Sequence, residues 1–466
     1  MKLPLDIKEN KENLIEKRYS FTELVDTYLK RIRKSDKRIN SFITITEKAA
    51  YDRVRFFDKE IVSKGSKIFD QYPLAGVVVS HKDMFLTKGI KTTAGSKVLS
   101  DYIPAYSSTV VEKLEKAGCI LIGKTNQDAW GHGSSGENSD FGPTKNPWNE
   151  KMVSGGSSSG SAAAVSMQFS MIATGTDTCG SVRVPANYCG IVGLKPTYGS
   201  VSRYGVIAMA SSLDSIGHMA KTTEDVESVF NITKGVDSKD ANVSKGKFIR
   251  ENNPVIGIPK EFFVEGLDSQ IKDNIEKNIK LLGSLGYKFK EVSLPLTKNA
   301  ISVYYIIMPA EVSSNLARYD GIRYGNKRTS FSEEAKRRIM LGSYVLSSGY
   351  IDKYYLKAAK VRTEIIKEMD KVFNEVDMLI APVAPTPPFL LGEKSTDPMK
   401  MYLNDIYSAT ASITGIPAIS IPSGFTKGGL PLGFQLMGPK FSECNLFDLG
   451  KDYQKNTSHH LKVPIL

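Results

Sequence analysis

The sequence contains few of the residues that proteins commonly use to bind metals or to transfer protons. Its 466 residues include only four cysteines and five histidines. Cys119, Cys179, Cys189 and Cys444 form no C-x-x-C pair and match no zinc-binding spacing. A chain of this length can bury enough apolar surface to fold without disulfide bonds. We therefore expect four reduced cysteines and no metal site.

Long apolar segments are also absent. The chain has no run of about eighteen uncharged apolar residues, the minimum for a membrane-spanning helix. Residues 1–14 (MKLPLDIKENKENL) lack the apolar stretch of a secretory signal. We therefore expect a cytoplasmic protein that does not associate with membranes.

The chain carries an excess of positive charge, with 62 Lys and Arg residues against 50 Asp and Glu residues and a net charge of +12. Such an excess is compatible with a polyanionic partner such as RNA. The lysines, however, are spread along the chain rather than gathered into one stripe. A solvated, lysine-rich surface is the simpler interpretation, with a nucleic-acid-binding surface as the alternative.

The pattern of apolar residues predicts an α/β fold. A capping box, Ser20-Phe21-Thr22-Glu23, opens an amphipathic helix, and the first sixty or so residues are expected to be helical. After Pro73, short β-branched runs alternate with helical stretches. The runs are Ala75–Val79, Cys119–Ile122, Val255–Ile258, Met378–Ile380, Ile419–Ile421 and Leu432–Leu436. This alternation is typical of a layered α/β fold with a largely buried sheet.

One stretch, residues 153–217, is crowded with Gly, Ser and Thr. Apolar segments at residues 162–165 and 171–173 interrupt it, and a flexible linker would not carry such segments. Small residues within buried structure allow the backbone to approach a ligand closely. The stretch therefore points to a functional site, with a tightly packed structural crossing as the alternative.

Three short motif matches occur, and none is convincing on its own. Gly118–Thr125 (GCILIGKT) has the P-loop spacing, but its interior is apolar, whereas a P-loop turns around phosphate. Gly131–Gly136 (GHGSSG) matches a dinucleotide fingerprint, yet the residues after it cannot open the required helix. Ser158 lies in a G-x-S-x-G pattern, which needs a later histidine and acid. The later histidines, none in a convincing context, are His218, His459 and His460.

The shortage of histidine favours lysine as the base if the Gly/Ser stretch holds a serine nucleophile. A lysine can act as a base only when burial lowers its pKa from ~10.4 toward ~7–8. Lys82 meets this requirement, because it follows the apolar run Leu74–Ser80 at the end of a predicted buried strand. In α/β folds, ligands bind at such strand ends.

Two linked motifs make the chain similar to the amidase signature family. Gly155–Ser161 (GGSSSGS) and Gly175–Arg183 (GTDTCGSVR) resemble the family pattern GGSS(G/S)G…GTD-x-GGS-x-R. Ser181 lies 24 positions after Ser157, which is the family separation.

The resemblance implies a role for each matching residue. Ser181 is expected to be the nucleophile, Ser157 the bridging serine that follows a cis peptide bond, and Lys82 the base. The backbone N–H groups expected to form the oxyanion hole belong to Thr178, Cys179 and Gly180, with Ser181 beside them.

The chain also departs from the family pattern. Cys179 replaces a usual Gly, so its Cβ would be strained if φ is positive there, and its thiol is a rival nucleophile. Met84 replaces a usual Asn and His218 a usual Pro. The segment between Arg323–Gly325 and the KRRI motif, Asn326–Glu334, is shorter than usual, which leaves the pocket rim or a partner contact open.

Segments outside the core motifs resemble one branch of the family, the glutaminase subunits of tRNA-dependent amidotransferases. These segments are Gly136–Ser139, Gly193–Gly199, Ser202–Gly205, Ala210–Asp214, Ser313–Gly321, Lys336–Gly342, Leu346–Tyr350 and Met401–Asp405. Glutamine needs a cation for its α-carboxylate and an anion for its α-ammonium group. By family position these are Arg338 and Asp405, with Tyr304 as a further pocket residue, and helix-surface charges are the alternative.

The resemblance implies one amidase domain over residues 1–466, with a mixed central β-sheet covered by helices on both faces. We divide it into an N-terminal helical segment (1–65), a Gly/Ser-rich core (66–225), a helical insertion with the substrate pocket (226–370) and the C-terminal part of the sheet (371–466).

The implied activity is glutamine hydrolysis through a Ser181 acyl-enzyme. The ammonia would pass to the B subunit, which makes most of the contacts with tRNA and uses ATP and Mg²⁺. That subunit would convert Glu-tRNA(Gln) to Gln-tRNA(Gln), Asp-tRNA(Asn) to Asn-tRNA(Asn), or both. The C subunit would complete a heterotrimer, and this chain would hold no cofactor. Two alternatives stay open: a free-standing amidase for another small amide, and a non-catalytic nucleotide- or RNA-binding protein.

Overall fold

The computed structural model describes residues 1–466 except 245, 264–265, 323–324, 395–397 and 466. The N-terminal region holds the helices α1 (Ile7–Ile15), α2 (Phe21–Ile39) and α3 (Glu47–Lys64). The predicted capping box is confirmed, because Ser20 Oγ accepts from Glu23 N–H and Glu23 Oε2 accepts from Ser20 N–H. The prediction of a wholly helical N-terminal region is wrong at β1 (Phe42–Ile45), which pairs antiparallel with a distant strand.

The described residues form one mixed sheet of eleven strands, in the order β1-β3-β2-β6-β8-β7-β12-β13-β11-β9-β10. Besides β1, its strands are β2 (Val78–Lys82), β3 (Ile120–Thr125), β6 (Ile172–Asp177), β7 (Val192–Lys195), β8 (Ser215–Ala220), β9 (Val255–Pro259), β10 (Lys288–Val292), β11 (Met378–Pro382), β12 (Ala418–Phe425) and β13 (Pro431–Met437). All six predicted β runs lie in or overlap these strands. The segment 226–370 also contributes strands β9 and β10 to the sheet.

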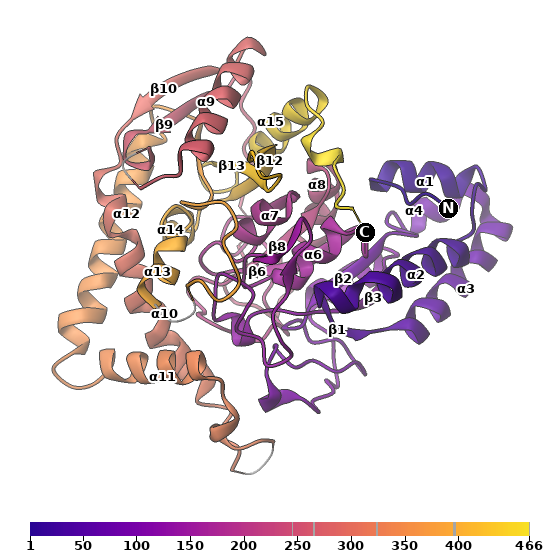
Figure 1. Ribbon diagram of the computed structural model, residues 1–466, viewed down its shortest axis with the longest axis horizontal. Helices are drawn as coiled ribbons and strands as arrows, with labels where there is room; N and C mark the ends of the chain where they lie inside the picture. The colour runs from indigo at the N-terminus through magenta and orange to yellow at the C-terminus, as the bar shows by residue number, and fades with distance from the viewer. Residues whose placement is uncertain (245, 264–265, 323–324, 395–397, 466) are drawn as a thin grey trace.

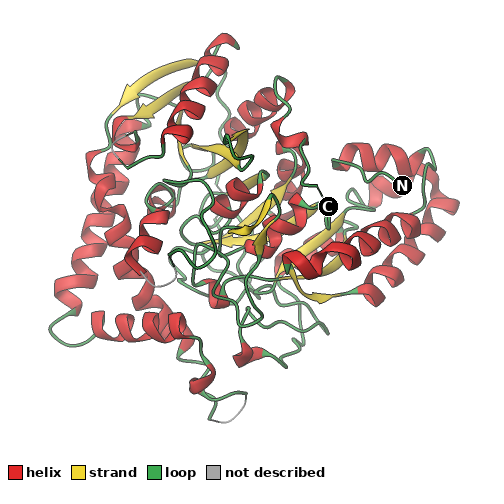
Figure 2. Cartoon of the chain, in the orientation of Figure 1, coloured by secondary structure: helices red, strands yellow, loops and turns green. Residues whose placement is uncertain are grey.

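Helices pack around this sheet, with the α1–α3 group at one end of the molecule and α9 to α12 at the other (Figures 1 and 2). The remaining helices are α4 (Ile68–Gln71), α5 (Thr109–Lys116), α6 (Ser159–Ser166), α7 (Arg183–Cys189), α8 (Thr223–Thr233), α9 (Ser269–Ser284), α10 (Ala300–Leu316), α11 (Glu333–Val345), α12 (Lys357–Val372), α13 (Pro398–Tyr402), α14 (Ala409–Thr414) and α15 (Glu443–Lys455). A separate hairpin pairs β4 (Lys145–Asn146) with β5 (Asn149–Val153). Among the described residues, no helix is both long and apolar enough to cross a membrane.

The centre of the sheet brings the Gly/Ser-rich elements together. Strands β2 and β6 are parallel neighbours, and they end at Lys82 and Asp177 respectively. Helix α6 begins at Ser159, just after Ser157, and helix α7 begins at Arg183, just after Ser181. Two strand ends and two helix starts are therefore available to build one site, as is usual in sheets of this type.

Candidate active site

Lys82 is a buried lysine that contacts hydroxyl groups instead of carboxylates. Its Nζ atom lies 2.8 Å from Ser157 Oγ and 2.8 Å from Thr176 Oγ1. Complete burial lowers the pKa of Lys82 to about 7, against the opposing influence of nearby carboxylates. A large share of Lys82 is therefore neutral near pH 7 and able to accept a proton.

Ser157 and Ser181 are neighbours through the backbone. A cis peptide bond joins Gly156 to Ser157, as the resemblance implied. The N–H of Ser158 donates to the carbonyl of Ser181 at 3.1 Å, which holds the two serine segments together. The Ser181 hydroxyl has no hydrogen-bond partner among the described residues, so the predicted relay from Ser181 to Ser157 is not closed by a hydrogen bond here.

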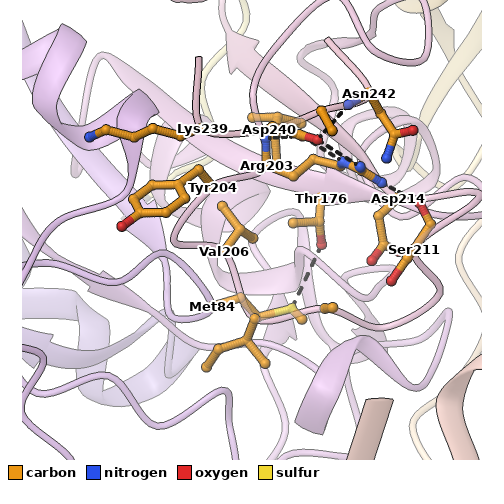
Figure 3. A pocket seen from close by; sticks show the side chains of 14 residues that line it. Met84, Thr176, Arg203, Tyr204, Val206, Ser211, Asp214, Lys239, Asp240 and Asn242 are labelled. Carbon is orange, nitrogen blue, oxygen red and sulfur yellow. Dashed lines mark hydrogen bonds and ion pairs between the residues drawn. The ribbon is translucent and has the colours of Figure 1, made fainter. Parts of the chain in front are cut away.

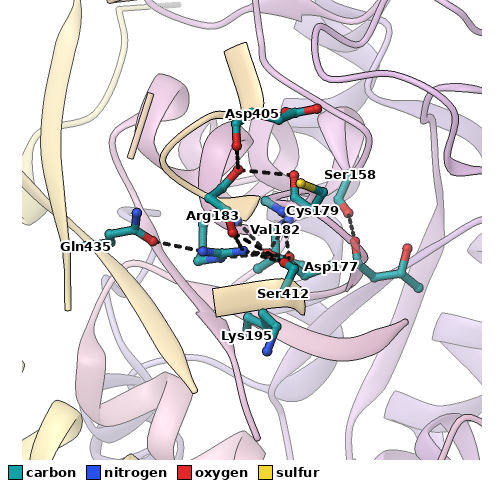
Figure 4. A network of polar contacts seen from close by, with 12 residues as sticks. Ser158, Asp177, Cys179, Val182, Arg183, Lys195, Asp405, Ser412 and Gln435 are labelled. Carbon is teal, nitrogen blue, oxygen red and sulfur yellow. Dashed lines mark hydrogen bonds and ion pairs between the residues drawn. The ribbon is translucent and has the colours of Figure 1, made fainter. Parts of the chain in front are cut away.

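An ion pair fixes the loop between β6 and α7 (Figure 4). Asp177 and Arg183, both fully buried, are joined by hydrogen bonds of 3.0 Å from Arg183 Nε and Nη2. Arg183 also donates to Gln435 Oε1 at 2.8 Å and to the Ser408 carbonyl at 3.0 Å. Burial alone would raise the pKa of Asp177, but the charge and hydrogen bonds of Arg183, with the Lys195 charge and the Gly180 N–H, together lower it. The buried Asp177–Arg183 ion pair and the further hydrogen bonds of Arg183 thus fix the loop that carries Ser181.

The backbone N–H groups of this loop differ in their availability. Gly180 N–H donates to Asp177 Oδ1 at 2.7 Å, so the expectation that it is a free oxyanion donor is not met in this structure. The N–H groups of Thr178, Cys179 and Ser181 have no partner in the described part of the chain. Gly180 has φ +89°, and a Cβ there would lie 2.4 Å from Ser408 Oγ, which explains why this position is glycine.

Cys179 fits the loop without backbone strain. It is absent from the non-glycine residues with positive φ, so the strain considered for a Cβ at this position does not arise. Its side chain is buried at 3% exposure, and burial raises the pKa of the thiol well above its usual value. A thiol that stays protonated is a poor nucleophile, which argues against the rival assignment to Cys179.

The predicted substrate residues gather around Tyr305, which the sequence analysis did not identify. Asp405 Oδ2 accepts from Tyr305 OH at 2.8 Å, and the Arg338 guanidinium lies over the Tyr305 ring at 5.9 Å. Tyr304 is buried, with its ring 4.9 Å from that of Tyr305. The structure thus brings Arg338, Asp405 and Tyr304 together, from α10, α11 and the short 3₁₀ helix at Leu403–Asp405.

Asp405 and Arg338, the charged residues predicted to bind glutamine, each have a side-chain atom without a hydrogen-bond partner among the described residues. Asp405 Oδ1 is buried without a partner, and burial raises the pKa of this carboxyl to about 7. Arg338 donates through Nε to Glu334 at 2.8 Å and through Nη1 to Met308 Sδ at 3.3 Å. Its Nη2 has no partner among the described residues. A carboxylate could therefore bind at Nη2 and an ammonium group at Asp405 Oδ1.

A cavity of about 160 Å³ lies beside Arg338. The hydroxyls of Ser134 and Ser135 line it, and both are buried without a partner. Nearby His132 has two unpartnered ring nitrogens and a pKa lowered well below its usual value, first by burial and then by the Arg338 charge. Sequence reasoning missed these residues, because the GHGSSG segment was considered only as a nucleotide motif.

The shortened segment Asn326–Glu334 runs into the first turn of α11, and its last residue lines this cavity. Glu334, which holds Arg338, is the second residue of α11 and also lines the cavity. Its position four residues before Arg338 is a helical ion-pair spacing that could have identified it. Upstream, Asn326 donates to the carbonyls of Lys97 and Val98. Residues 323 and 324 of the Arg-Tyr-Gly motif lie outside the described residues.

A second cavity, of about 300 Å³, lies beside the lysine site, and Figure 3 shows the side chains that line it. Thr176, the hydroxyl partner of Lys82, lines it together with Met84. The Met84 sulfur accepts from Thr176 Oγ1 at 3.8 Å, so the methionine that departs from the family pattern packs directly behind the base. The ion pair between Arg203 and Asp240, 2.9 Å long, forms the opposite wall.

The three weak motif matches have structural explanations. Lys124 of the P-loop match lies on β3 and forms a buried ion pair with Asp83, 3.0 Å between Nζ and Oδ1. Gly131–Gly136 leads into an irregular loop and then β4, with no helix after it. His218 is buried in β8 and its Nε2 lies 2.8 Å from Thr233 Oγ1, so it does not serve Ser158.

Comparisons with known proteins agree with this geometry. The family described as Amidase matches residues 23–447. The A subunit of glutamyl-tRNA(Gln) amidotransferase from Carboxydothermus hydrogenoformans is 47% identical over 485 aligned residues, and the match covers 99% of both chains. The protein of the same description from Coxiella burnetii is 46% identical, again with 99% of both chains covered.

Solved structures give the same result for the fold. The crystal structure of the A subunit of glutamyl-tRNA(Gln) amidotransferase from Thermotoga maritima matches with a TM-score of 0.82 and 36% identity, over 98% of this chain and 97% of that chain. A 6-aminohexanoate cyclic dimer hydrolase matches in fold with a TM-score of 0.88 at 21% identity, over 99% of both chains. Since the family match and these full-length relatives span nearly all of the sequence, the chain belongs to the amidase family.

Proposed function

We propose that this chain is the glutamine-hydrolysing subunit of a tRNA-dependent amidotransferase. The observation that carries the proposal is the buried hydrogen bond between Lys82 and Ser157, beside the Ser181 loop. The arrangement of Arg338 and Asp405 around Tyr305 supports glutamine as the substrate. The similarity to the A subunits of glutamyl-tRNA(Gln) amidotransferases over 99% of the chain supports the same assignment.

Acylation begins when Ser181 Oγ attacks the side-chain amide of glutamine. Ser181 gives its proton to Ser157 Oγ as Ser157 gives its own to neutral Lys82, so the new bond forms between oxygen and the amide carbon. The N–H groups of Thr178, Cys179 and Ser181 stabilise the oxyanion, and losing one such donor typically costs ~100–1,000-fold in rate. The C–N bond then breaks while Lys82 returns a proton through Ser157, and ammonia leaves. Water hydrolyses the acyl-enzyme to glutamate by the reverse proton path.

Recognition of glutamine rests on two opposite charges. Arg338 Nη2 binds the α-carboxylate and Asp405 Oδ1 binds the α-ammonium group, which gives a partner to the buried Asp405 Oδ1. An ammonium group beside Asp405 also favours the ionised carboxylate and lowers its pKa. Ligands without either charge leave a buried group unpaired and are therefore poor substrates.

The ammonia passes to another protein of the complex in this proposal. The B subunit holds ATP, Mg²⁺ and most of the tRNA contacts, and it amidates Glu-tRNA(Gln), Asp-tRNA(Asn), or both. The C subunit makes the complex a heterotrimer, which works in the cytoplasm. The support for this assembly is the description of the relatives as amidotransferase subunits.

The test is to express the chain with and without its genomic neighbours and to measure glutamate release from glutamine. Glutamine hydrolysis that increases when the B and C subunits, ATP and Glu-tRNA(Gln) are added would support the proposal. Hydrolysis that ignores these additions would favour a free-standing amidase. A chain that copurifies with RNA but forms no covalent adduct at Ser181 would favour the non-catalytic alternative.

A further inference from the structure

Asp128 is a buried carboxylate beside the site that the mechanism does not use. It precedes the short helix Ala129–Gly131 and is fully enclosed. Its N–H donates to the carbonyl of Ser157 at 3.2 Å. Its side chain accepts from Gly136 N–H at 3.1 Å and from Asn138 N–H at 2.8 Å. Asp128 therefore holds both Ser157 and the loop that follows Asp128 in the chain, at Gly136 and Asn138.

Two glycines pack against this carboxylate. A Cβ on Gly156, the residue before Ser157, would lie 2.0 Å from Asp128 Oδ2. A Cβ on Gly133, which lines the cavity beside Arg338, would lie 2.5 Å from Asp128 Cγ. Glycine is therefore needed at both positions, because a side chain at either one would displace the Asp128 carboxylate.

Asp128 also lies near the catalytic lysine, because its N–H donates to the carbonyl of Ser157, whose hydroxyl accepts from Lys82 Nζ at 2.8 Å. Three buried carboxylates, Asp128, Asp214 and Asp177, oppose the effect of burial on Lys82, and Asp128 is the strongest of them. Asp177 is paired with Arg183, and Asp214 accepts from Thr178 Oγ1 at 2.8 Å. Asp128 accepts from backbone N–H groups, and the charged groups that act on it are Lys82 and, with opposite sign, Glu137.

We propose that Asp128 is a positioning residue that joins Ser157 to the wall of the substrate cavity and supplies a buried negative charge to Lys82. This inference rests on the roles proposed above for Lys82, Ser157 and Ser181. Removing the charge disfavours protonated Lys82, so the lysine becomes neutral at a lower pH. Changing the side chain keeps the backbone bond to Ser157, but it weakens the bonds to Gly136 and Asn138 and the packing against Gly156, so the segment that carries Ser157 is less firmly held. A residue that only stabilises the fold would do neither.

The experiment uses the full chain and a fluorophosphonate probe. Ser181 Oγ forms a bond to phosphorus and fluoride leaves, so the reaction needs the nucleophile and its base but no glutamine. The labelling rate is measured from pH 5 to pH 9 for wild type, Asp128→Asn and Asp128→Ser. In both variants we expect the acidic limb of the profile to move down by about one pH unit. The plateau rate should fall by roughly tenfold or more because Ser157 is less well placed.

Asp140→Asn is the matched control. Asp140 lies in the same loop and accepts from Ser96 Oγ at 3.1 Å and Lys97 N–H at 2.8 Å, so it anchors the loop away from Lys82. The acidic limb of its labelling-rate profile should lie at the same pH as that of wild type. An unmoved limb in Asp128→Asn and Asp128→Ser, or loss of folding in both by thermal melting, would overturn the proposal. If the wild type is labelled but does not hydrolyse glutamine, the proposed substrate fails while the test of Asp128 stands.

Discussion

Lys82 Nζ lies 2.8 Å from Ser157 Oγ, and this fully buried lysine is hydrogen-bonded to hydroxyls, with no carboxylate of the described residues in contact. A lysine paired with a carboxylate would be held in its charged form. The contact with Ser157 instead leaves the amine able to accept a proton. Lys124, on the neighbouring strand, has the opposite arrangement, because it is paired with Asp83 at 3.0 Å.

This difference predicts opposite results for two lysine substitutions. Lys82→Met removes the base, and we expect glutamine hydrolysis to fall by roughly 100–10,000-fold with little change in the free energy of unfolding. Lys124→Met leaves Asp83 buried without its partner, which costs about 3–5 kcal/mol of stability. Glutamate release and denaturant unfolding, measured on both variants, separate the two roles. A stable Lys124→Met chain without activity, beside an active Lys82→Met chain, would refute the assignment of the base.

The pH dependence of hydrolysis should contain two separable transitions. Burial lowers the pKa of Lys82 to about 7, and the neutral amine is the active form. The value of kcat should therefore rise with pH through about 7. Burial raises the pKa of Asp405 to about 7, and the ionised form binds ammonium, so KM should fall with rising pH over the same range. Asp405→Asn should abolish the transition in KM and keep the transition in kcat, as measured by initial rates from pH 5.5 to 8.5.

The sequence predicted that Lys82 and Ser157 lie together because both belong to contiguous motifs. The Gly155–Ser161 and Gly175–Arg183 segments carry their small residues at fixed spacing, and Lys82 ends an apolar run. β1 (FITI) was expected to be helical, but six other strands rich in apolar residues were predicted. Strands β7 (VGLK) and β8 (SIGHMA) were not, because short Gly- and Ser-containing strands carry no strong signal of their own. Their pairing within the sheet forms them.

The substrate pocket shows where sequence reasoning ends. Tyr305 and Asp405 are joined by a hydrogen bond across 100 positions of the chain, and no local pattern predicts such a contact. Likewise, the acceptor of Gly180 N–H could be found only in three dimensions, since the motif gives the spacing of Asp177 and Gly180 but not the direction of the carboxylate.

For glutamine binding, the several N–H donors of the Arg338 guanidinium should matter more than its positive charge. Arg338→Lys keeps a cation but loses the Nε contact to Glu334 and the free Nη2. A charge-assisted hydrogen bond is worth about 1.5–3 kcal/mol, so we expect KM for glutamine to rise by roughly 10–100-fold with a smaller change in kcat. Lys336→Ala is the control, because Lys336 pairs with the exposed Glu333 on the same helix. Equal KM values for Arg338→Lys and wild type would remove Arg338 from the substrate site.

Cys179 should be replaceable without loss of chemistry. Its backbone N–H is an oxyanion donor in the proposed mechanism, and any residue except proline supplies that group. Its φ is not positive, so glycine has no conformational advantage here, and the buried thiol stays protonated. We expect Cys179→Ala and Cys179→Gly to keep kcat within about threefold of wild type, whereas Ser181→Ala should abolish hydrolysis and fluorophosphonate labelling. Mass spectrometry of the labelled peptides distinguishes the two sites. An adduct on Cys179, or activity lost in Cys179→Ala and kept in Ser181→Ala, would make the cysteine the nucleophile.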